Sequence, residues 1–204
     1  EGVNTIFGYP GGVVLPLYDE LPRYPDLRHI LVRHEQGAAH MADGYARASG
    51  KVGVCLATSG PGATNLVTGI ATSFLDSTPM LAITGNVAIT KHNYLVMRAE
   101  NIALTVREAL YIARTGRPGP VHIDIPKDVF QEEANFEWPE EITLRGYRPT
   151  LDGHAGMIRR AAELINTAER PIIISGHGII WGDAQQELVA MAEKADIPVV
   201  TTFL

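Results

Sequence analysis

The sequence is short of three features that would assign it to particular classes of protein. It has a single cysteine in 204 residues, which excludes an intrachain disulfide framework. No apolar run reaches the roughly 18 residues that a membrane-spanning helix needs, so we expect no membrane association. The net charge is −6 and no cluster of lysine and arginine occurs, so a nucleic-acid groove is not expected either. A hydrophobic content of 46% leaves enough apolar material for a sizeable globular core.

Short apolar runs alternate with helix-length amphipathic segments, which is the pattern of βαβ units around a parallel sheet. The strands predicted in the first part of the chain are 5–8, 29–32, 53–57, 80–84 and 121–125. The helices predicted between them are 13–21, 36–49, 62–74 and 101–114. The sequence therefore predicts an α/β fold with a parallel sheet.

A change of composition divides the chain. Residues 130–150 carry acids, two prolines and Trp138 without a clear period, which is typical of a linker between domains. Residues 1–129 then form one domain, and 151–204 are the start of a second α/β domain. The βαβ pattern of that second part stops at Leu204 before it is complete, and the chain opens at Glu1 in the middle of a pattern. We expect both the natural N-terminus and most of the second domain to be missing.

The most informative residue is Glu35, which follows an apolar strand and precedes a helix rich in glycine and alanine. In open α/β sheets, ligands bind at the carboxyl ends of the strands, and a glutamate at that place faces the ligand. The alternative interpretation is that Glu35 is an acid in the first helical turn, stabilised by the helix dipole.

Four loops leave the carboxyl ends of consecutive predicted strands, and three of them are rich in glycine: 9–12, 34–36, 58–62 and 84–86. Glycine allows the backbone to approach a ligand closely. Each loop can also be read as a tight turn between strand and helix. The loop at 58–62 opens a helix, whose N–H groups suit a polar or anionic ligand. It lacks the Gly-Lys-Ser/Thr of a phosphate loop, and Pro61 removes an N–H that a phosphate would use.

Longer motifs carry a resemblance to a known family. They are FGYPGG (7–12), RHEQGAAHMADGYAR (33–47), SGPGATN (59–65), LDSTPM (75–80) and ARTGRPGPVHIDIPKD (113–128). These motifs closely resemble the pyrimidine-binding domain of thiamine-diphosphate enzymes, in particular the catalytic large subunits of the acetolactate (acetohydroxyacid) synthases. The resemblance covers nearly the whole chain. It implies a flavodoxin-like pyrimidine-binding domain followed by the start of a Rossmann-like middle domain.

In this family a glutamate at the position of Glu35 hydrogen-bonds N1′ of the cofactor's aminopyrimidine and favours the imino form that activates the thiazolium ring. The resemblance makes Glu35 the catalytic residue and a thiamine-diphosphate contact. It assigns further contacts with this cofactor to Tyr9, Pro10, Gly11, Pro61 and Asn65. For Asn65, an unremarkable place on a helix surface is the alternative.

The resemblance also implies FAD, which the family retains largely for structure. Ser77 and Arg117 match positions that contact FAD. The alternative for Ser77 is a simple turn or cap, and the alternative for Arg117 is an exposed arginine in a loop. In the second part the resemblance assigns FAD contacts to Gly176, His177, Gly178 and Thr202. It places the Mg²⁺ ligands outside this chain, in a diphosphate-binding domain that this chain lacks, so no metal ligand is predicted here.

The implied activity is a transferase reaction in isoleucine and valine biosynthesis. Pyruvate loses CO₂ and its two-carbon unit joins a second 2-oxo acid, either pyruvate or 2-oxobutanoate, to give 2-acetolactate or 2-aceto-2-hydroxybutanoate. The family forms homodimers or dimers of dimers with active sites between subunits, and a regulatory small subunit can join them. We expect this fragment alone to be inactive. A bacterial or archaeal cytoplasm is the expected location, with a plastid as the alternative.

Two other functions fit some of the same residues. Glu35 and the Gly-Pro-Gly loop occur across the superfamily, so a sibling pyruvate oxidase or decarboxylase is one alternative. A non-catalytic nucleotide-binding module with a flavodoxin-like sheet is the other, and it predicts that Glu35→Gln changes nothing.

The chain departs from the family pattern at one place. Beyond residues 84–87 the family has a further segment, with a Phe-Gln-Glu motif whose Gln reaches the cofactor. Either this segment is deleted or an active-site loop has been left out of the sequence. We favour the omitted loop, because segments near active sites are often mobile.

Overall fold

A computed structural model describes residues 2–85, 92–150 and 152–202. The chain divides into two compact units, Glu1–Pro149 and Thr150–Leu204. Between Gln131 and Thr150 the described chain contains no helix or strand. This division does not test the predicted limits of domain and linker (1–129, 130–150 and 151–204), which stay a prediction.

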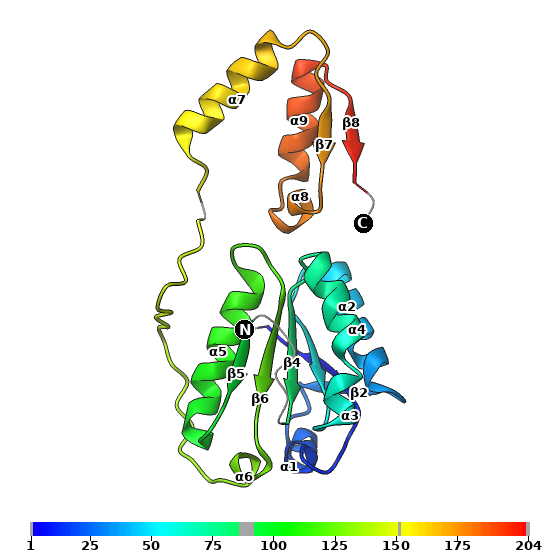
Figure 1. The fold of residues 1–204 in the computed structure, drawn as a ribbon, viewed down its shortest axis with the longest axis vertical. Helices are drawn as coiled ribbons and strands as arrows, with labels where there is room; N and C mark the ends of the chain where they lie inside the picture. The colour runs from blue at the N-terminus through cyan, green and yellow to red at the C-terminus, as the bar shows by residue number, and fades with distance from the viewer. Residues whose placement is uncertain (1, 86–91, 151, 203–204) are drawn as a thin grey trace. The chain divides into compact units, whose positions relative to one another are not determined.

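The first unit is built on a six-stranded parallel sheet with the order β2-β1-β3-β4-β6-β5 (Figure 1). Its strands are β1 (Thr5–Gly8), β2 (Arg28–Leu31), β3 (Gly53–Leu56), β4 (Met80–Thr84), β5 (Asn93–Leu95) and β6 (Pro120–Asp124). Every neighbouring pair is parallel. The predicted parallel α/β fold is confirmed. The prediction missed β5, because three residues at a sheet edge are too short to show a period.

Helices cover both faces of this sheet (Figure 1). They are α1 (Leu15–Glu20), α2 (Glu35–Ser49), α3 (Pro61–Thr64), α4 (Val67–Leu75), α5 (Ile102–Arg114) and α6 (Lys127–Phe130), with short 3₁₀ turns at Leu21–Arg23 and Ala99–Asn101. Helices α2 and α4 pack on one face, and α5 packs on the other. The site-bearing loops are therefore held between two helical layers.

Two of the predicted elements differ from the structure. The predicted helix 62–74 is divided into α3 and α4, because the Leu66 N–H bonds to the Ala63 carbonyl, one residue closer than in a regular α-helix. Glu35 was predicted to lie in a loop before the helix, but it is the first residue of α2. His34 has an extended backbone and ends the loop, and its Nδ1 accepts from Gln36 N as the helix N-cap.

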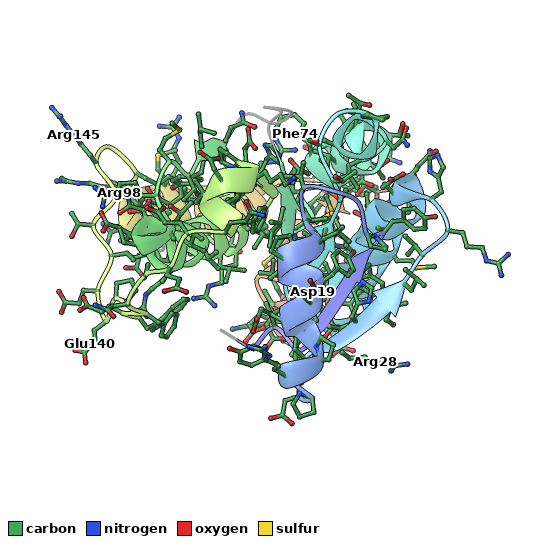
Figure 2. All side chains as sticks on the ribbon, turned by 90° about the horizontal axis from the view of Figure 1, so that it is seen from below. Asp19, Arg28, Phe74, Arg98, Glu140 and Arg145 are labelled. Atoms are coloured by element: carbon green, nitrogen blue, oxygen red, sulfur yellow. The ribbon has the colours of Figure 1, made fainter. Side chains whose placement is uncertain are left out.

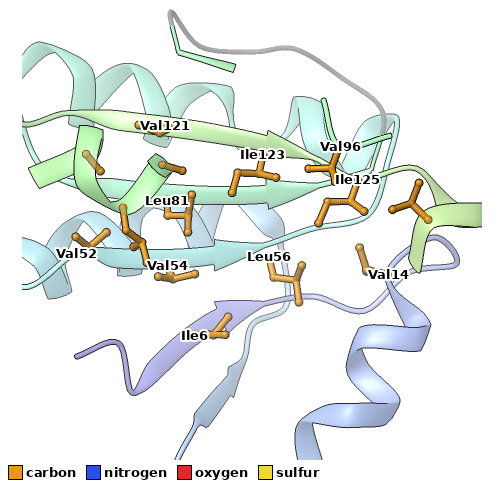
Figure 3. Close-up of a cluster of buried hydrophobic side chains, with 14 residues drawn as sticks. Ile6, Val14, Val52, Val54, Leu56, Leu81, Val96, Val121, Ile123 and Ile125 are labelled. Carbon is orange, nitrogen blue, oxygen red and sulfur yellow. The ribbon is translucent and has the colours of Figure 1, made fainter. Parts of the chain in front are cut away.

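Successive side chains of the central strands point to opposite faces of the sheet, and they form two apolar clusters, one on each face. On the α5 face, Val54 and Leu56 pack with residues from neighbouring strands (Figure 3). On the α2 face, the core is made mainly of small residues, among them Ala38, Ala39 and Ala42. Small side chains bring α2 close to the sheet, so the position of Glu35 at its first turn follows from this packing.

The described part of the second unit contains one parallel strand pair and three helices: α7 (Ala155–Thr167), β7 (Ile173–Ser175), α8 (Gly178–Trp181), α9 (Gln185–Ala195) and β8 (Val199–Thr201). This arrangement confirms the predicted start of a second α/β domain. None of the described helices of the chain is long and apolar enough to span a bilayer.

The contact of α2 with β3 predicts opposite effects at two glycines. A Cβ at Gly53 would collide with the backbone carbonyl of Ala42, whereas a Cβ at Gly44, inside α2, would meet nothing within 4 Å. Gly53→Ala should lower the free energy of unfolding by about 1–3 kcal/mol through overpacking. Gly44→Ala should raise it by up to about 1 kcal/mol through helix propensity. Thermal unfolding of the full-length protein measures both, and equal shifts would contradict the packing.

Candidate active site

The strand order defines where a ligand crevice opens. From β1 the chain crosses to β2 on one side and then to β3 on the other, so the order reverses between β1 and β3. In open α/β sheets the ligand crevice lies outside the carboxyl ends of the strands at such a switch point. The elements α1 and α3, which follow β1 and β3, lie at this edge, at the bottom of Figure 1, and Figure 2 is the view onto it. Asp19, on α1, is labelled at this edge in Figure 2.

Glu35 stands at this switch point. Its side chain is half-buried, and its Oε2 accepts a hydrogen bond of 3.0 Å from Asn65 Nδ2 at the end of α3. Among the described residues, none donates to Oε1. The arrangement therefore fixes one carboxylate oxygen and leaves the other able to bind a donor or share a proton with a ligand.

Thr58, two residues beyond the end of β3, fills the space between two glycines of the site. A Cβ at Gly11 would lie 2.5 Å from Thr58 Cβ, and a Cβ at Gly62 would lie 2.7 Å from Thr58 Cγ2. The same Cβ at Gly62 would lie 3.3 Å from Glu35 Oε1. Thr58 Oγ1 also accepts from Val13 N at 3.4 Å. Thr58 thus sets the separation between the loop after β1 and the carboxylate.

The sequence analysis placed Thr58 in a turn but not among the site residues. The contact of Thr58 with a glycine of another loop could be predicted only if the strand order were known, because it depends on β1 and β3 being neighbours. The residues predicted to bind thiamine diphosphate are only partly joined by contacts. Gly11 packs against Thr58, and Asn65 bonds Glu35, whereas Tyr9 is 41% exposed and Pro61 is exposed at the start of α3. Pro10 lies between Tyr9 and Gly11, and the binding role of all these residues stays a prediction.

The predicted FAD contacts of the first unit lie at the opposite edge of the sheet. Ser77 precedes β4 and Arg117 precedes β6, so both lie at the amino ends of strands. Arg117 Nε donates to Ser77 Oγ at 2.5 Å, and Nη2 donates to the Leu75 carbonyl at 3.4 Å. The structure therefore brings the two residues together, although they are far apart in the sequence.

A cavity of about 450 Å³ opens beside this pair. It is lined by Phe74, His92, Ile112, Val121, Tyr147 and residues 116–120, 146, 148 and 149. Among the described residues, the lining includes Arg117 and Arg148 but no aspartate or glutamate. Within residues 2–85, 92–150 and 152–202, neither arginine pairs with a carboxylate. The cavity is therefore suited to an anionic ligand.

The predicted FAD residues of the second unit lie near the ends of its two strands. Thr202 N donates to the Ser175 carbonyl at 2.9 Å, and a Cβ at Gly176 would lie 3.9 Å from Thr202 Oγ1. His177 packs edge-on against Trp181 at 5.3 Å, and neither of its buried ring nitrogens has a partner in the described chain. Gly178 begins α8. The structure thus brings Thr202 beside Gly176, whereas His177 packs on Trp181, and the role of all four residues in binding FAD stays a prediction.

Two other titratable groups, Cys55 and His122, are buried in the sheet. Burial raises the pKa of the Cys55 thiol to about 12, so this residue belongs to the core and not to a reactive site. Burial lowers the pKa of His122 to about 4, and its Nε2 lies 2.6 Å from Thr84 Oγ1. Among the described residues, no group of three or more His, Cys, Asp and Glu side chains could hold a metal ion.

The parallel sheet with a carboxylate at its switch point places this unit in the class of ligand-binding α/β domains. Comparison with family models identifies the family. Residues 1–105 match the model "Thiamine pyrophosphate enzyme, N-terminal TPP binding domain", and 158–204 match "Thiamine pyrophosphate enzyme, central domain". The chain belongs to the thiamine pyrophosphate enzymes.

Individual relatives indicate which members of this family the chain resembles. The acetolactate synthase large subunit of Buchnera aphidicola (subspecies Schizaphis graminum) is 48% identical over all of this chain and 40% of its own length. The acetolactate synthase large subunit of Corynebacterium glutamicum is 51% identical over 98% of this chain and 35% of its own. The resemblance to acetolactate synthase large subunits is confirmed. This chain spans 35–40% of the length of these relatives.

A solved structure supports the fold. An X-ray structure from Mycobacterium smegmatis, assigned to the thiamin diphosphate-dependent enzymes, has a TM-score of 0.84 at 24% identity over all of this chain and 42% of that one.

The Buchnera alignment extends over 226 positions, so it is longer than this chain of 204 residues. The segment predicted to be absent after residue 87 adjoins residues 86–91, outside the described residues.

The packing of Thr58 gives a compensation test. Gly62→Ala should weaken thiamine-diphosphate binding by about tenfold, because overpacking costs about 1–3 kcal/mol. Adding Thr58→Ser removes the Cγ2 that the new methyl group meets, so the double variant should recover most of the affinity. Cofactor titration of the full-length protein measures both dissociation constants.

Gly11→Ala is the matched control. Its Cβ would meet Cγ2 of Thr58, but also Cβ at 2.5 Å and Oγ1 at 2.9 Å, and serine retains both of these atoms. Thr58→Ser should not rescue it. Equal rescue of both glycine variants, or none of either, would contradict the assigned contacts.

Proposed function

We propose that this chain supplies the aminopyrimidine-binding part of an acetolactate synthase. The proposed reaction joins the two-carbon unit of pyruvate to a second pyruvate or to 2-oxobutanoate with loss of CO₂, a step of isoleucine and valine biosynthesis. The observation that carries the proposal is the Glu35 carboxylate at the switch point, with Oε2 held by Asn65 and Oε1 without a donor among the described residues. The family models and the named relatives support it.

The residues present fit thiamine diphosphate. Oε1 of Glu35 can accept from, or share a proton with, a ring nitrogen. The backbone at Gly12, Gly37 and Gly60, close to Glu35 or in the neighbouring loops, leaves open space for a ligand, because a Cβ at any of the three would meet nothing within 4 Å. When bound, this cofactor supplies the electron sink for removing CO₂ from a 2-oxo acid.

The chain's own residues have three tasks in this proposal. Glu35 holds a proton at the pyrimidine nitrogen through the oxygen that Asn65 leaves free. Asn65 fixes the rotamer of that carboxylate through Nδ2, so its orientation does not have to be ordered when the ligand binds. The loop Tyr9–Gly12, spaced by Thr58, borders the place of the reacting carbonyl.

Two further groups belong to the proposal. FAD contacts Arg117 and Ser77 in the first unit, and Gly176, His177, Gly178 and Thr202 in the second. The cavity beside Arg117 has two arginines that pair with no carboxylate in the described part of the chain, and it suits the phosphates of such a ligand. Mg²⁺ takes its ligands from outside this chain.

The proposed assembly is a homodimer or a dimer of dimers, joined by a regulatory small subunit in some members. The proposed location is the cytoplasm of a bacterium or archaeon, with a plastid as the alternative. The bacterial relatives support the first of these.

Replacing the central carboxylate is the direct functional test. Glu35→Gln keeps the shape but cannot exchange a proton with the cofactor, so turnover should fall by about 100-fold or more. The measurement identifies the products formed from pyruvate by the full-length protein with thiamine diphosphate, Mg²⁺ and FAD. Glu163→Gln, an exposed glutamate on α7, is the control and should leave the rate unchanged.

Each outcome assigns a function. Acetolactate from the wild type, lost in Glu35→Gln, supports the proposal. Acetaldehyde or acetate as the product would move the protein to a sibling decarboxylase or oxidase. Absence of turnover and of cofactor binding would leave a non-catalytic module.

The fragment itself should not turn over substrate. It contains the candidate pyrimidine site but, in this proposal, no Mg²⁺ ligand and no diphosphate site. Pyruvate consumption by the isolated 204-residue chain, with all three cofactors added, should equal the rate without protein. Thiamine-dependent turnover by the isolated chain would refute this expectation.

A further inference from the structure

An ion-pair cluster joins α2 to the end of α4 on the helical face of the sheet, and the proposed function does not use it. Arg47 Nε lies 2.8 Å from Asp43 Oδ2, and Arg47 Nη2 lies 2.5 Å from Asp76 Oδ2. Ser73 Oγ donates to Asp43 Oδ1 at 2.8 Å, and Asp43 is only 7% exposed. A part-buried bidentate arginine pair of this kind is stronger than an exposed surface pair.

Asp76 belongs to the turn Leu75–Ser77, which has an uncommon backbone conformation. Ser77 has φ of 56°, in the left-handed region that non-glycine residues rarely adopt. Such a conformation persists only where neighbouring contacts impose it. Besides the bonds from Arg117, the contacts on this turn are the Arg47–Asp76 pair and three backbone bonds: Asp76 N to Thr72 O, Ser77 N to Phe74 O and Thr78 N to Ser73 O.

This conformation gives Arg117 its two acceptors. Ser77 Oγ and the Leu75 carbonyl lie on either side of Asp76, and both accept from the Arg117 guanidinium. Phe74, which is labelled in Figure 2, comes from the same end of α4 and lines the cavity together with Arg117. The turn therefore connects the ion-pair cluster to a cation at the cavity wall.

We infer that Asp43, Arg47 and Asp76 are positioning residues for Arg117. The cluster holds the Leu75–Ser77 turn with Ser77 in the left-handed region, and the turn orients the guanidinium toward an anionic ligand in the cavity. The inference rests on the proposed function in one respect, namely that this ligand is FAD. Arg47 and Asp76 touch neither the cavity nor Glu35, so their effect on the ligand acts only through the turn.

Asp76→Asn in the full-length protein tests the inference, because it removes the charge from the more exposed end of the cluster and leaves the buried Asp43–Arg47 pair intact. FAD binding should weaken by about three- to tenfold, the range typical of coupled neighbours. Thiamine-diphosphate binding, at the opposite edge of the sheet, should stay unchanged. Flavin and thiamine titrations of the same preparations measure both.

A double-variant cycle separates positioning from general destabilisation. Ser77→Gly removes the Oγ acceptor and accepts the left-handed backbone without strain. If Asp76 acts through Ser77, then Asp76→Asn combined with Ser77→Gly should bind FAD no more weakly than Ser77→Gly alone. Glu20→Gln, which breaks the exposed pair with Arg23, is the control and should change neither affinity.

The outcomes are distinguishable. Additive losses, an unchanged FAD affinity in Asp76→Asn, or an equal loss of thiamine-diphosphate affinity would overturn the inference. A wild-type protein that binds no flavin would contradict the FAD part of the proposed function alone. In that case a crystal structure of Asp76→Asn decides the positioning: loss of the Arg117–Ser77 bond supports the inference, and its retention overturns it.

Discussion

The site depends on the close packing of one threonine between two loops. Thr58 leaves no room for a side chain at Gly11 or at Gly62, so the loop after β1 and the start of α3 approach it as bare backbone. Gly62 in turn lies beside Glu35, whose carboxylate Asn65 holds. Three strand ends are thus brought to fixed separations by one short side chain. Protein interiors do not deform smoothly, so this spacing is a rigid property of the fold.

The parallel sheet separates two kinds of chemistry. Its carboxyl edge carries the half-buried Glu35, and its amino edge carries Arg117 beside a cavity without acids. Because all strands run in one direction, a residue that precedes a strand and one that follows it cannot share an edge. The Glu35 carboxylate and the Arg117 guanidinium are thereby kept apart, so they do not form an ion pair with each other.

The sequence predicted most of the sheet, because buried parallel strands are nearly continuous apolar runs bounded by glycine-rich turns. The place of Glu35 followed from the end of such a run. The short edge strand β5 and the break between α3 and α4 were missed, since three residues carry no period and a single displaced hydrogen bond at Leu66 leaves no mark in composition. Thr58 was missed because its role depends on which strands are neighbours. Ser77 and Arg117 were both predicted as ligand residues, but their mutual bond depends on a turn conformation that only packing determines.

The central claim is that Glu35 presents one oxygen to the cofactor while Asn65 holds the other. A crystal structure of the full-length protein with thiamine diphosphate bound tests it most directly. The account predicts Glu35 Oε1 within hydrogen-bond distance of the pyrimidine N1′, with Oε2 still bonded to Asn65 Nδ2. A bound cofactor whose pyrimidine lies away from Glu35, or a carboxylate released from Asn65 with both oxygens in solvent, would contradict it.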